Sequence, residues 1–228
     1  KKLSSIGTLA SGTAHQINNP LNNISTSCQL ALAESGPKLD LFTIQMLQTI
    51  DQETQRAGDI VRGLLEFSKA HTFSIQTVPL NIVINKTIQL VASEVPAGIT
   101  LEHEVPDDII VSLDVQKMIE ALLNLTINAI QAIPESGIIT ISTQQNKKMV
   151  VMRIQDTGTG IPEKIRNQIF DPFFTTKDVG HGSGLGLYIV HDIVEMHGGS
   201  IRVETRPGQG TTFIVWLRDR PAETGEKS

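Results

Sequence analysis

Apolar and small side chains recur at heptad-like intervals through residues 1–70, and this spacing constrains the fold more than any other feature of the 228-residue chain. The first run of such positions comprises Leu3, Ile6, Ala10, Thr13, Ile17, Ile24 and Ala31. The second run comprises Leu47, Ile50, Thr54, Ala57, Val61 and Leu64. Intervals of three and four residues predict a helix with one packed seam. Gly36 and Pro37 are stop signals between the runs, within residues 34–40, so the sequence predicts a helical hairpin.

A hairpin of this kind leaves most of its apolar surface uncovered, because two amphipathic helices alone bury little area. Dimerisation into a four-helix bundle is the economical way to cover both seams, so we expect a homodimer. The alternative is a hairpin that packs on its own C-terminal domain.

The pattern changes from about Ile75 onward, where helix-like segments alternate with short β-rich ones. Helices are predicted at residues 81–94, 114–133 and 184–197, with Asn81 and Asp114 as N-caps of the first two and Gly198 and Gly199 ending the third. Strands are predicted at residues 99–105, 138–144, 149–155, 200–205 and 211–217. The mixed order predicts an α/β sandwich with helices on one face of a mixed sheet.

These patterns divide the chain into a hairpin domain at residues 1–70, a linker at 71–77 and an α/β domain at 78–218. The polar tail at residues 219–228 is expected to be disordered. A hinge between the two domains is expected near residues 69–77.

Composition excludes some classes of function. The net charge is −5 and no dense basic run occurs, so nucleic acid is not an expected partner. A single cysteine, Cys28, rules out an internal disulfide framework and fits a reducing, cytoplasmic compartment. No apolar stretch approaches the roughly 20 residues that span a bilayer. The chain opens within a predicted helix, which is typical of a fragment, so membrane attachment is expected only through an upstream region.

His15 lies on the first predicted helix, in the segment His-Gln-Ile-Asn-Asn-Pro-Leu at residues 15–21. If Leu3, Ala10 and Ile17 mark one edge of the seam, His15 falls on the outward face. Pro20 removes a backbone donor nearby and is expected to kink or loosen the helix. An isolated exposed histidine is usually a solvated surface residue, so the surrounding motif decides its interpretation.

Three segments of the α/β domain indicate a nucleotide site. Asn124 and Asn128 are four residues apart on a helix, one turn beyond Glu120, and their oxygens suit a hydrated Mg²⁺. Asp156 follows a predicted strand and precedes Gly158 and Gly160, a tight turn with exposed backbone donors. Taken alone, these are also a polar helix face and a surface turn.

The third segment, Gly-His-Gly-Ser-Gly-Leu-Gly-Leu at residues 180–187, opens a predicted helix whose N-terminus favours an anion. It is neither a Walker A loop, since no Gly-Lys-Ser/Thr follows, nor a dinucleotide fingerprint, since no strand precedes it. Three phenylalanines within residues 170–174 precede this loop. They indicate a mobile lid with a hydrophobic latch, or plain core packing.

Residues 15–21 resemble the H-box of sensor histidine kinases, His-Glu-Ile-Asn-Asn-Pro-Leu, at six of seven positions. Residues 120–213 resemble, in order, the N, G1, F and G2 boxes and the last glycine box of the Bergerat (GHKL) ATP-binding domain, shared with gyrase, MutL-type and heat-shock chaperone ATPases. Single motifs are moderately specific, whereas the ordered series is very specific. The resemblance implies ATP-dependent phosphorylation of His15 and transfer to an aspartate on the receiver domain of a response regulator.

The resemblance also implies roles for individual residues. Asn128 would be the Mg²⁺ ligand with Asn124 near the phosphates, and Asp156 would bind adenine with help from Thr211 through water. Gly158 and Gly160 would shape the adenine pocket. The remaining implied nucleotide-binding residues, in the lid and phosphate loop, are Lys177, Gly182, Gly184, Leu185 and Gly186.

Two positions depart from the family pattern. Gln16 stands where the family has Glu or Asp, and an amide does not serve as a base near neutral pH, so we expect reduced kinase activity. Thr157 replaces the usual Asn, with a small expected effect on nucleotide affinity. Asn19, one turn beyond His15, is retained and would orient water in the reverse, phosphatase reaction.

Two rival functions remain open. One is a phosphatase-biased or trapped-state histidine kinase, which Gln16 and Asn19 favour. The other is a non-enzymatic ATP-binding dimerisation module that signals by conformation alone. An ATP-driven clamp, with Glu120 activating water, fits less well because such clamps carry no H-box on a preceding hairpin.

Overall fold

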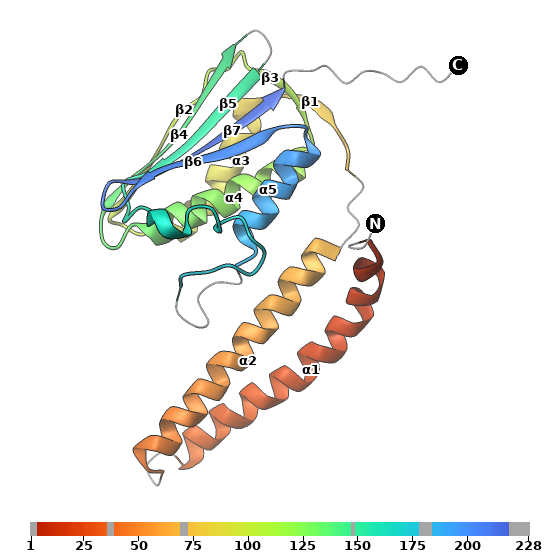
Figure 1. The fold of residues 1–228 in the computed structure, drawn as a ribbon, viewed down its shortest axis with the longest axis vertical. Coiled ribbons are helices and arrows are strands. Elements are labelled where there is room, and N and C mark those ends of the chain that lie inside the picture. Colours follow the sequence, from red (N-terminus) through yellow and green to blue (C-terminus); the bar gives the residue numbers. More distant parts are fainter. Residues whose placement is uncertain (1–3, 36–38, 69–72, 147–148, 178–183, 219–228) are drawn as a thin grey trace. The chain divides into compact units, whose positions relative to one another are not determined.

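The computed structural model describes residues 4–35, 39–68, 73–146, 149–177 and 184–218, and it divides into two compact units (Figure 1). The first unit contains residues 1–72 together with residues 171–185. The second contains residues 73–170 together with residues 186–228. The predicted stop signals Gly36 and Pro37 and the predicted tail at 219–228 lie outside the described residues.

The first unit contains the predicted helical hairpin, formed by α1 (Ser4–Ser35) and α2 (Leu41–Ser68). α1 continues through Pro20 as one helix. Asp40 begins α2, because its Oδ1 accepts the backbone N–H of Thr43 at 2.8 Å and its Oδ2 accepts the Thr43 hydroxyl at 2.9 Å. The backbone N–H of Thr43 is the main reason that the pKa of the Asp40 carboxyl lies below its usual value.

The packing between α1 and α2 includes polar as well as apolar side chains. Cys28 on α1 and Thr54 on α2 are buried. The Ser25 hydroxyl donates to Oδ1 of Asp51 at 2.5 Å, and Nε2 of Gln29 donates to Oδ2 of Asp51 at 3.3 Å. A polar group at a seam position fixes the register of paired helices at some cost in stability.

Among the seam positions whose side chains are described, three stay exposed in the single chain. Ile17, Ile24 and Ile50 are 40%, 43% and 45% exposed. Leu41 and Phe42, at the start of α2, are exposed by 71% and 69%. The hairpin therefore carries apolar surface that its own two helices do not cover.

The second unit is built on a five-stranded mixed sheet in the order β2-β4-β5-β7-β6. The strands are β2 (Ile99–Glu104), β4 (Gly137–Asn146), β5 (Met149–Asp156), β6 (Ser200–Arg206) and β7 (Gly210–Arg218). β2 pairs parallel with β4, and the other pairs are antiparallel. All five predicted strands are confirmed, and no end differs from the prediction by more than two residues.

Three helices, α3 (Leu80–Val91), α4 (Val115–Ala132) and α5 (Gly186–Met196), cover one face of this sheet (Figure 1). Short 3₁₀ helices follow α3 at η2 (Ala92–Glu94) and β5 at η3 (Glu163–Ile165). α4 is the central helix, and its apolar face, which includes Met118, Leu122 and Leu125, is buried. The predicted α/β sandwich with helices on one face is confirmed.

One predicted N-cap is confirmed and the other is wrong. Oδ1 of Asp114 accepts the backbone N–H of Lys117 at 3.0 Å and caps α4. α3 begins earlier than predicted, after Pro79, which has an extended backbone and no side-chain cap. Asn81 lies inside α3 instead, where its Nδ2 donates to Oδ1 of Asp107 at 2.8 Å.

A small two-stranded sheet was absent from the predicted elements. β1 (Gln76–Pro79) pairs antiparallel with β3 (Ile110–Leu113). Gln76 and Thr77, assigned to the linker by sequence, thus lie in a strand. Four residues are too few to show an alternating pattern, so the pairing depends on tertiary contacts.

The predicted helix at 184–197 is shorter in the structure. Gly184 has φ of +68°, a left-handed conformation outside the α-helix, and α5 begins at Gly186. Gly198, with φ of +65°, and Gly199 donate to the carbonyls of Glu195 and Val194 at 2.8 and 2.9 Å. These are the two hydrogen bonds of a Schellman motif, so both glycines end the helix as predicted.

No helix in the described ranges is both long enough and apolar enough to cross a membrane.

Candidate nucleotide and phosphoacceptor sites

Asp156 ends β5 with a buried side chain, 3% exposed. Its Oδ1 accepts the backbone N–H groups of Gly158 at 2.8 Å and Thr211 at 3.2 Å. Burial raises the pKa of Asp156, while these two hydrogen bonds act in the opposite direction. Among the described residues no donor contacts Oδ2, so one carboxylate oxygen is fixed in place and the other is available to a ligand.

The two glycines after Asp156 are required by close backbone contacts. A Cβ on Gly158 would lie 2.4 Å from the carbonyl oxygen of Ala132, at the end of α4. A Cβ on Gly160 would lie 2.2 Å from the carbonyl oxygen of Arg206, and Gly160 has φ of +70°. The turn is therefore clamped between α4 and the end of β6, and no larger residue fits without a shift of the backbone.

Thr211 stands directly opposite Asp156 in the register of β5 and β7. Its hydroxyl lies 3.1 Å from the hydroxyl of Thr205, which accepts the backbone N–H of Ile161 at 2.8 Å. Gly210, with φ of +91°, comes so close to Asp156 that a Cβ would lie 2.0 Å from the Asp156 carbonyl oxygen. Sequence reasoning named Thr211 and placed Gly210 in the last glycine box, but it missed Thr205.

Thr157 has a structural role at the start of β4. Its Oγ1 accepts the backbone N–H of Ile138 at 2.9 Å, and its own N–H donates to the Ile138 carbonyl at 3.1 Å. A Cβ on Gly137 would lie 2.5 Å from this hydroxyl oxygen. The departure from the family's Asn therefore occurs where threonine joins the turn to the neighbouring strand.

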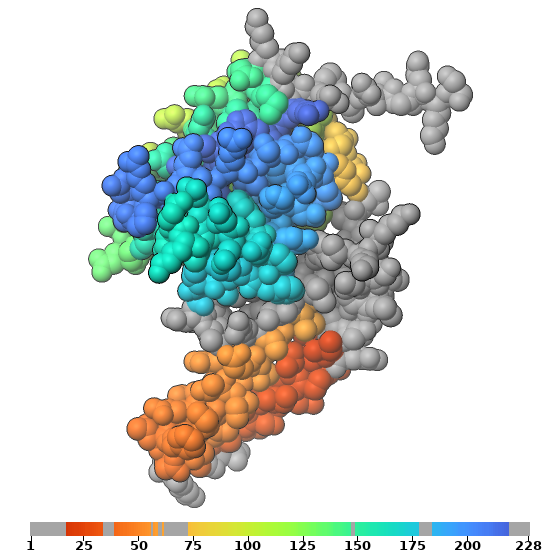
Figure 2. All heavy atoms as spheres, in the orientation of Figure 1, coloured from red at the N-terminus to blue at the C-terminus, as the bar shows by residue number. Residues whose placement is uncertain are grey.

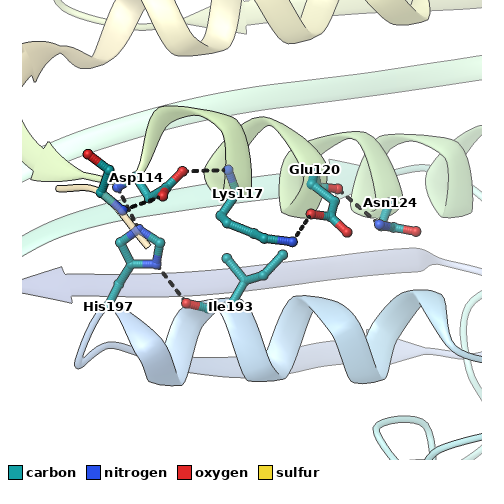
Figure 3. Close-up of polar contacts among 7 residues, drawn as sticks. Asp114, Lys117, Glu120, Asn124, Ile193 and His197 are labelled. Atoms are coloured by element: carbon teal, nitrogen blue, oxygen red, sulfur yellow. Dashed lines mark hydrogen bonds and ion pairs between the residues drawn. The ribbon is translucent and has the colours of Figure 1, made fainter. Parts of the chain in front are cut away.

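Asn124 and Asn128 both face the beginning of α5. A Cβ on Gly186 would lie 2.9 Å from Oδ1 of Asn124 and 3.9 Å from Nδ2 of Asn128. Nδ2 of Asn124 donates to the carbonyl of Glu120 at 2.9 Å, which leaves its oxygen toward Gly186 (Figure 3). Two amides therefore lie beside the N-terminus of a helix, which attracts anions.

One face of α4 connects these features, because Asn124, Asn128 and Ala132 are spaced four residues apart. Eight residues of α-helix extend about 12 Å. The carbonyl of Ala132 accepts the N–H of Thr159 at 2.9 Å, so the far end of this face supports the turn after Asp156. Glu120, one turn before Asn124, is paired with Lys117 at 2.7 Å.

Phe170 contacts aromatic side chains of α5 and β7 in the second unit. Its ring lies 5.7 Å from that of His191 on α5 and 6.4 Å from that of Phe213 on β7. Phe170 therefore packs against both α5 and β7, whose unit presents α5, β6 and β7 in shades of blue on the face shown in Figure 2. This phenylalanine, the first of the three in the predicted lid, packs against the core.

The predicted lid and phosphate-loop residues belong mainly to the first unit. The backbone N–H of Lys177 donates to Oγ1 of Thr175 at 3.2 Å. A Cβ on Gly184 would lie 2.4 Å from the carbonyl carbon of Phe173, and Leu185 is buried. Gly182 lies outside the described residues.

The H-box residues lie on α1. His15 and Gln16 fall within the helix, but their side chains are not among those described. Asn19 follows one turn later and is exposed. Asn124, Asn128, Asp156, Gly158, Gly160, Gly186 and Thr211 all belong to the second unit.

No three His, Cys, Asp or Glu side chains in the described ranges are grouped so as to hold a metal ion. A hollow of about 510 Å³ lies between the end of β4 and the segment that joins β2 to β3, and its lining includes Pro106, Ile109 and Gln145. None of the motif residues lines this hollow.

Comparisons with known proteins match both parts of the chain. The family of histidine kinase-, DNA gyrase B- and HSP90-like ATPases matches residues 113–221, and the His Kinase A (phospho-acceptor) domain matches residues 5–72. The sensor histidine kinase ZraS of Escherichia coli (strain K12) is 37% identical over 222 residues, which are 95% of this chain and 46% of ZraS. The chain thus spans about half the length of this relative.

Two solved structures are also similar. The catalytic domain of histidine kinase ThkA, in a nucleotide-free form, is 33% identical with a TM-score of 0.58, over 65% of this chain and 99% of that one. ThkA in complex with the response regulator protein TrrA is 30% identical with a TM-score of 0.69, over 97% of this chain and 64% of that one. With the phosphoacceptor match preceding the ATPase match in the sequence, the chain belongs to the sensor histidine kinases of two-component systems.

Proposed function

We propose that this chain is the catalytic core of a sensor histidine kinase that transfers the γ-phosphoryl group of ATP to His15 and then to an aspartate of a response regulator. The observation that carries the proposal is Asp156, a buried carboxylate with Oδ1 fixed by two backbone donors and Oδ2 uncontacted among the described residues. The similar ThkA was solved with a response regulator, which supports a receiver domain as the partner.

The residues present fit ATP. Oδ2 of Asp156 would accept a hydrogen bond from the adenine amino group, and Gly158 and Gly160 keep side chains out of the turn beside it. Thr211 would assist through water. The phosphates would lie toward Asn124 and the N-terminus of α5, where amide groups and the helix dipole favour negative charge. Lys177, Gly182, Gly184 and Leu185 would cover them.

The residues also fit Mg²⁺. Asn128 would supply an amide oxygen, and Mg²⁺ commonly keeps several waters and phosphate oxygens as its other ligands, so a cluster of protein carboxylates is unnecessary. When bound, the ion neutralises charge on the phosphates during transfer.

In the reaction, an imidazole nitrogen of His15 attacks the γ-phosphorus as the bond to the ADP oxygen breaks. The family's acid after the histidine accepts the imidazole proton, and Gln16 lacks this capacity. We therefore propose reduced autokinase activity, with the proton passing to solvent. Asn19 is exposed one turn along α1 and would orient water in the phosphatase reaction, so a phosphatase-biased enzyme is the second candidate.

We also propose that the hairpin dimerises into a four-helix bundle. The support is the uncovered apolar surface of the hairpin, including Ile17, Ile24 and Ile50. We place the reaction in the cytoplasm.

The test is incubation of the chain with radiolabelled ATP and Mg²⁺, beside His15→Ala and Gln16→Glu variants. We expect acid-labile label that is lost in His15→Ala and that accumulates about 100-fold faster in Gln16→Glu, the scale of general-base catalysis. Label on neither the parent nor Gln16→Glu, despite ATP binding, would favour the non-enzymatic module. Equal rates in both would refute the role given to Gln16.

Label only in Gln16→Glu would instead favour the phosphatase-biased or trapped-state enzyme. Release of phosphate from a phosphorylated receiver domain, measured with the parent and with Asn19→Ala, separates these two. Loss of release in Asn19→Ala is expected of a phosphatase.

A further inference from the structure

Asp114 uses both carboxylate oxygens to join two segments of the second unit. Oδ1 accepts the backbone N–H of Lys117 at 3.0 Å and caps α4. Oδ2 accepts the backbone N–H of Ser74 at 2.8 Å, in the segment by which the chain enters this unit. Asp114 is 3% exposed. Burial raises the pKa of its carboxyl, but the hydrogen bonds from the backbone N–H groups of Lys117 and Ser74 outweigh burial and hold the pKa below its usual value.

His197, at the end of α5, joins a third segment to the same point (Figure 3). Its Nε2 accepts the backbone N–H of Asp114 at 2.9 Å, and its Nδ1 lies 2.7 Å from the carbonyl of Ile193. A ring with an acceptor at Nε2 and a donor at Nδ1 is a neutral imidazole. The ring of Phe73 stands edge-on to it, 4.8 Å between centroids at 71°.

These five residues, Phe73, Ser74, Asp114, Ile193 and His197, form what we term the clasp. The clasp joins the start of α4 to the end of α5. About 15 Å along α4, by the rise of ten helical residues, Asn124 meets the start of α5 at Gly186. The two helices are thus fixed against each other at two points, and the second of these is the proposed phosphate end of the nucleotide site.

We propose that Asp114 and His197 are positioning residues, which couple the segment entering the ATP-binding domain to the placement of α5 at the phosphate end of the nucleotide site. The inference rests on the proposed function. Neither residue would touch ATP; they would act through Asn124 and Gly186. A change in the path of Phe73 and Ser74 would alter the clasp, and with it the spacing between the α4 amides and the α5 N-terminus.

The clasp requires a neutral imidazole. The backbone N–H of Asp114 donates to Nε2. If Nε2 carried a proton, this backbone N–H and the ring N–H would point at each other, and the hydrogen bond would be lost. Asp114 is the charged group that faces the ring, from α4; the segment entering the unit contributes Phe73 and Ser74, and α5 contributes the carbonyl of Ile193. Burial lowers the pKa of His197. The hydrogen bond with the Ile193 carbonyl and the charge of Asp114 raise it, but the pKa remains below its usual value.

Two amide variants of His197 test the proposal, because their functional group is the same and only its reach differs. In His197→Gln the side-chain oxygen can take the place of Nε2 and accept from Asp114. In His197→Asn the shorter side chain can reach only the Ile193 carbonyl. Ser74→Pro, which removes the N–H that Asp114 accepts, and Ser74→Ala, which keeps it, form a second matched pair.

The measurements are the affinity of the whole chain for ATP with Mg²⁺ and the NMR resonances of the Gly186 N–H and the Asn124 side-chain amide without nucleotide. Both measurements are made well below the melting temperature, so a variant that has only lost stability remains folded. We expect His197→Asn and Ser74→Pro to move both resonances and to weaken ATP binding about tenfold, the scale of one buried hydrogen bond. His197→Gln and Ser74→Ala should remain within about twofold.

Unchanged resonances and affinity in His197→Asn, or equal losses in both amide variants, would overturn the proposal. If the unaltered chain binds no ATP, the proposed function fails, yet the nucleotide-free resonances still decide the coupling. If the Gly186 and Asn124 resonances move in His197→Asn but not in His197→Gln, the coupling is supported. If they do not move in His197→Asn, the coupling is refuted.

Discussion

At the scale of single residues, the proposed nucleotide site depends on how Asp156 is oriented. Gly158 and Thr211 both donate to Oδ1, so the carboxylate does not rotate freely and Oδ2 keeps one direction. The fixed acceptor is already in place before a ligand arrives, which reduces the entropy lost on binding.

Asp156→Asn is expected to weaken ATP binding about 10- to 100-fold, the scale of a hydrogen bond to a charged group. The two backbone donors require the amide oxygen at the Oδ1 position, so the amide nitrogen would face the adenine amino group as donor against donor. Calorimetric titration measures the effect. Glu163→Gln, the same chemical change on η3 outside the site, serves as control, and an affinity of Asp156→Asn within twofold of it would contradict the assignment.

Gly158→Ala is expected to destabilise the second unit by about 1–3 kcal/mol, the usual cost of overpacking, because the new Cβ would lie 2.4 Å from the Ala132 carbonyl. Gly208→Ala is the comparison: nothing lies within 4 Å of its Cβ, and only the φ of +76° is strained. Urea unfolding monitored by Trp216 should show the larger loss in Gly158→Ala. The reverse order would refute the close-packed turn.

At the scale of elements, α4 and α5 meet at the proposed phosphate end of the nucleotide site. α4 supplies Asn124 and Asn128 on one side, and α5 supplies the helix N-terminus at Gly186. His197 links the opposite ends of the same two helices. Stability of this pair is therefore expected to depend on the protonation of His197.

The pH dependence follows from the lowered pKa of His197. Between that pKa and the ordinary histidine value of 6.5, the unfolded chain binds more protons than the folded one, so the free energy of unfolding decreases as the pH falls. Urea unfolding at pH values from about 7.5 to 5 should show this loss. This loss of stability should be smaller in His197→Gln. It should be retained in His103→Gln, because the side chain of His103 is exposed on β2. Equal dependence of the free energy of unfolding on pH in the parent and both variants would refute the contribution of His197.

At the scale of the whole molecule, the described part of the hairpin leaves large apolar side chains exposed in a single chain. Ile50 is 45% exposed and Phe42 is 69% exposed, although both lie on an amphipathic helix. Exposed apolar side chains on a helix of this kind are typical of an interface.

Ile50→Lys is therefore expected to weaken the proposed dimer by more than about tenfold, because a buried interface position would receive a charge. Light scattering across a range of concentrations measures the change. Gln52→Lys places the same charge about 200° around the helix and should leave the mass unchanged. A parent chain that remains monomeric at all concentrations would disprove the four-helix bundle.

The sequence alone determined the features that local patterns encode. Heptad spacing predicted the hairpin, β-rich segments predicted five strands within two residues, and Asp114 was identifiable as a cap because its partner Lys117 is three residues away. Gly158, Gly160 and Asp156 were identifiable as a motif because their spacing along the chain is fixed. The predictions of the hairpin, the strands and the Asp114 cap succeeded because each depends on neighbours in sequence.

Only the tertiary structure decided the contacts between distant segments. The pairing of Asp156 with Thr211 spans 55 positions and the bond from Asp114 to His197 spans 83, and neither leaves a periodic trace in the sequence. The same reason explains the missed pairing of β1 with β3 and the misplaced cap at Asn81, whose side chain bonds Asp107 across the fold. Local propensity places a residue on its element, whereas the packing of one element on another decides which groups it meets.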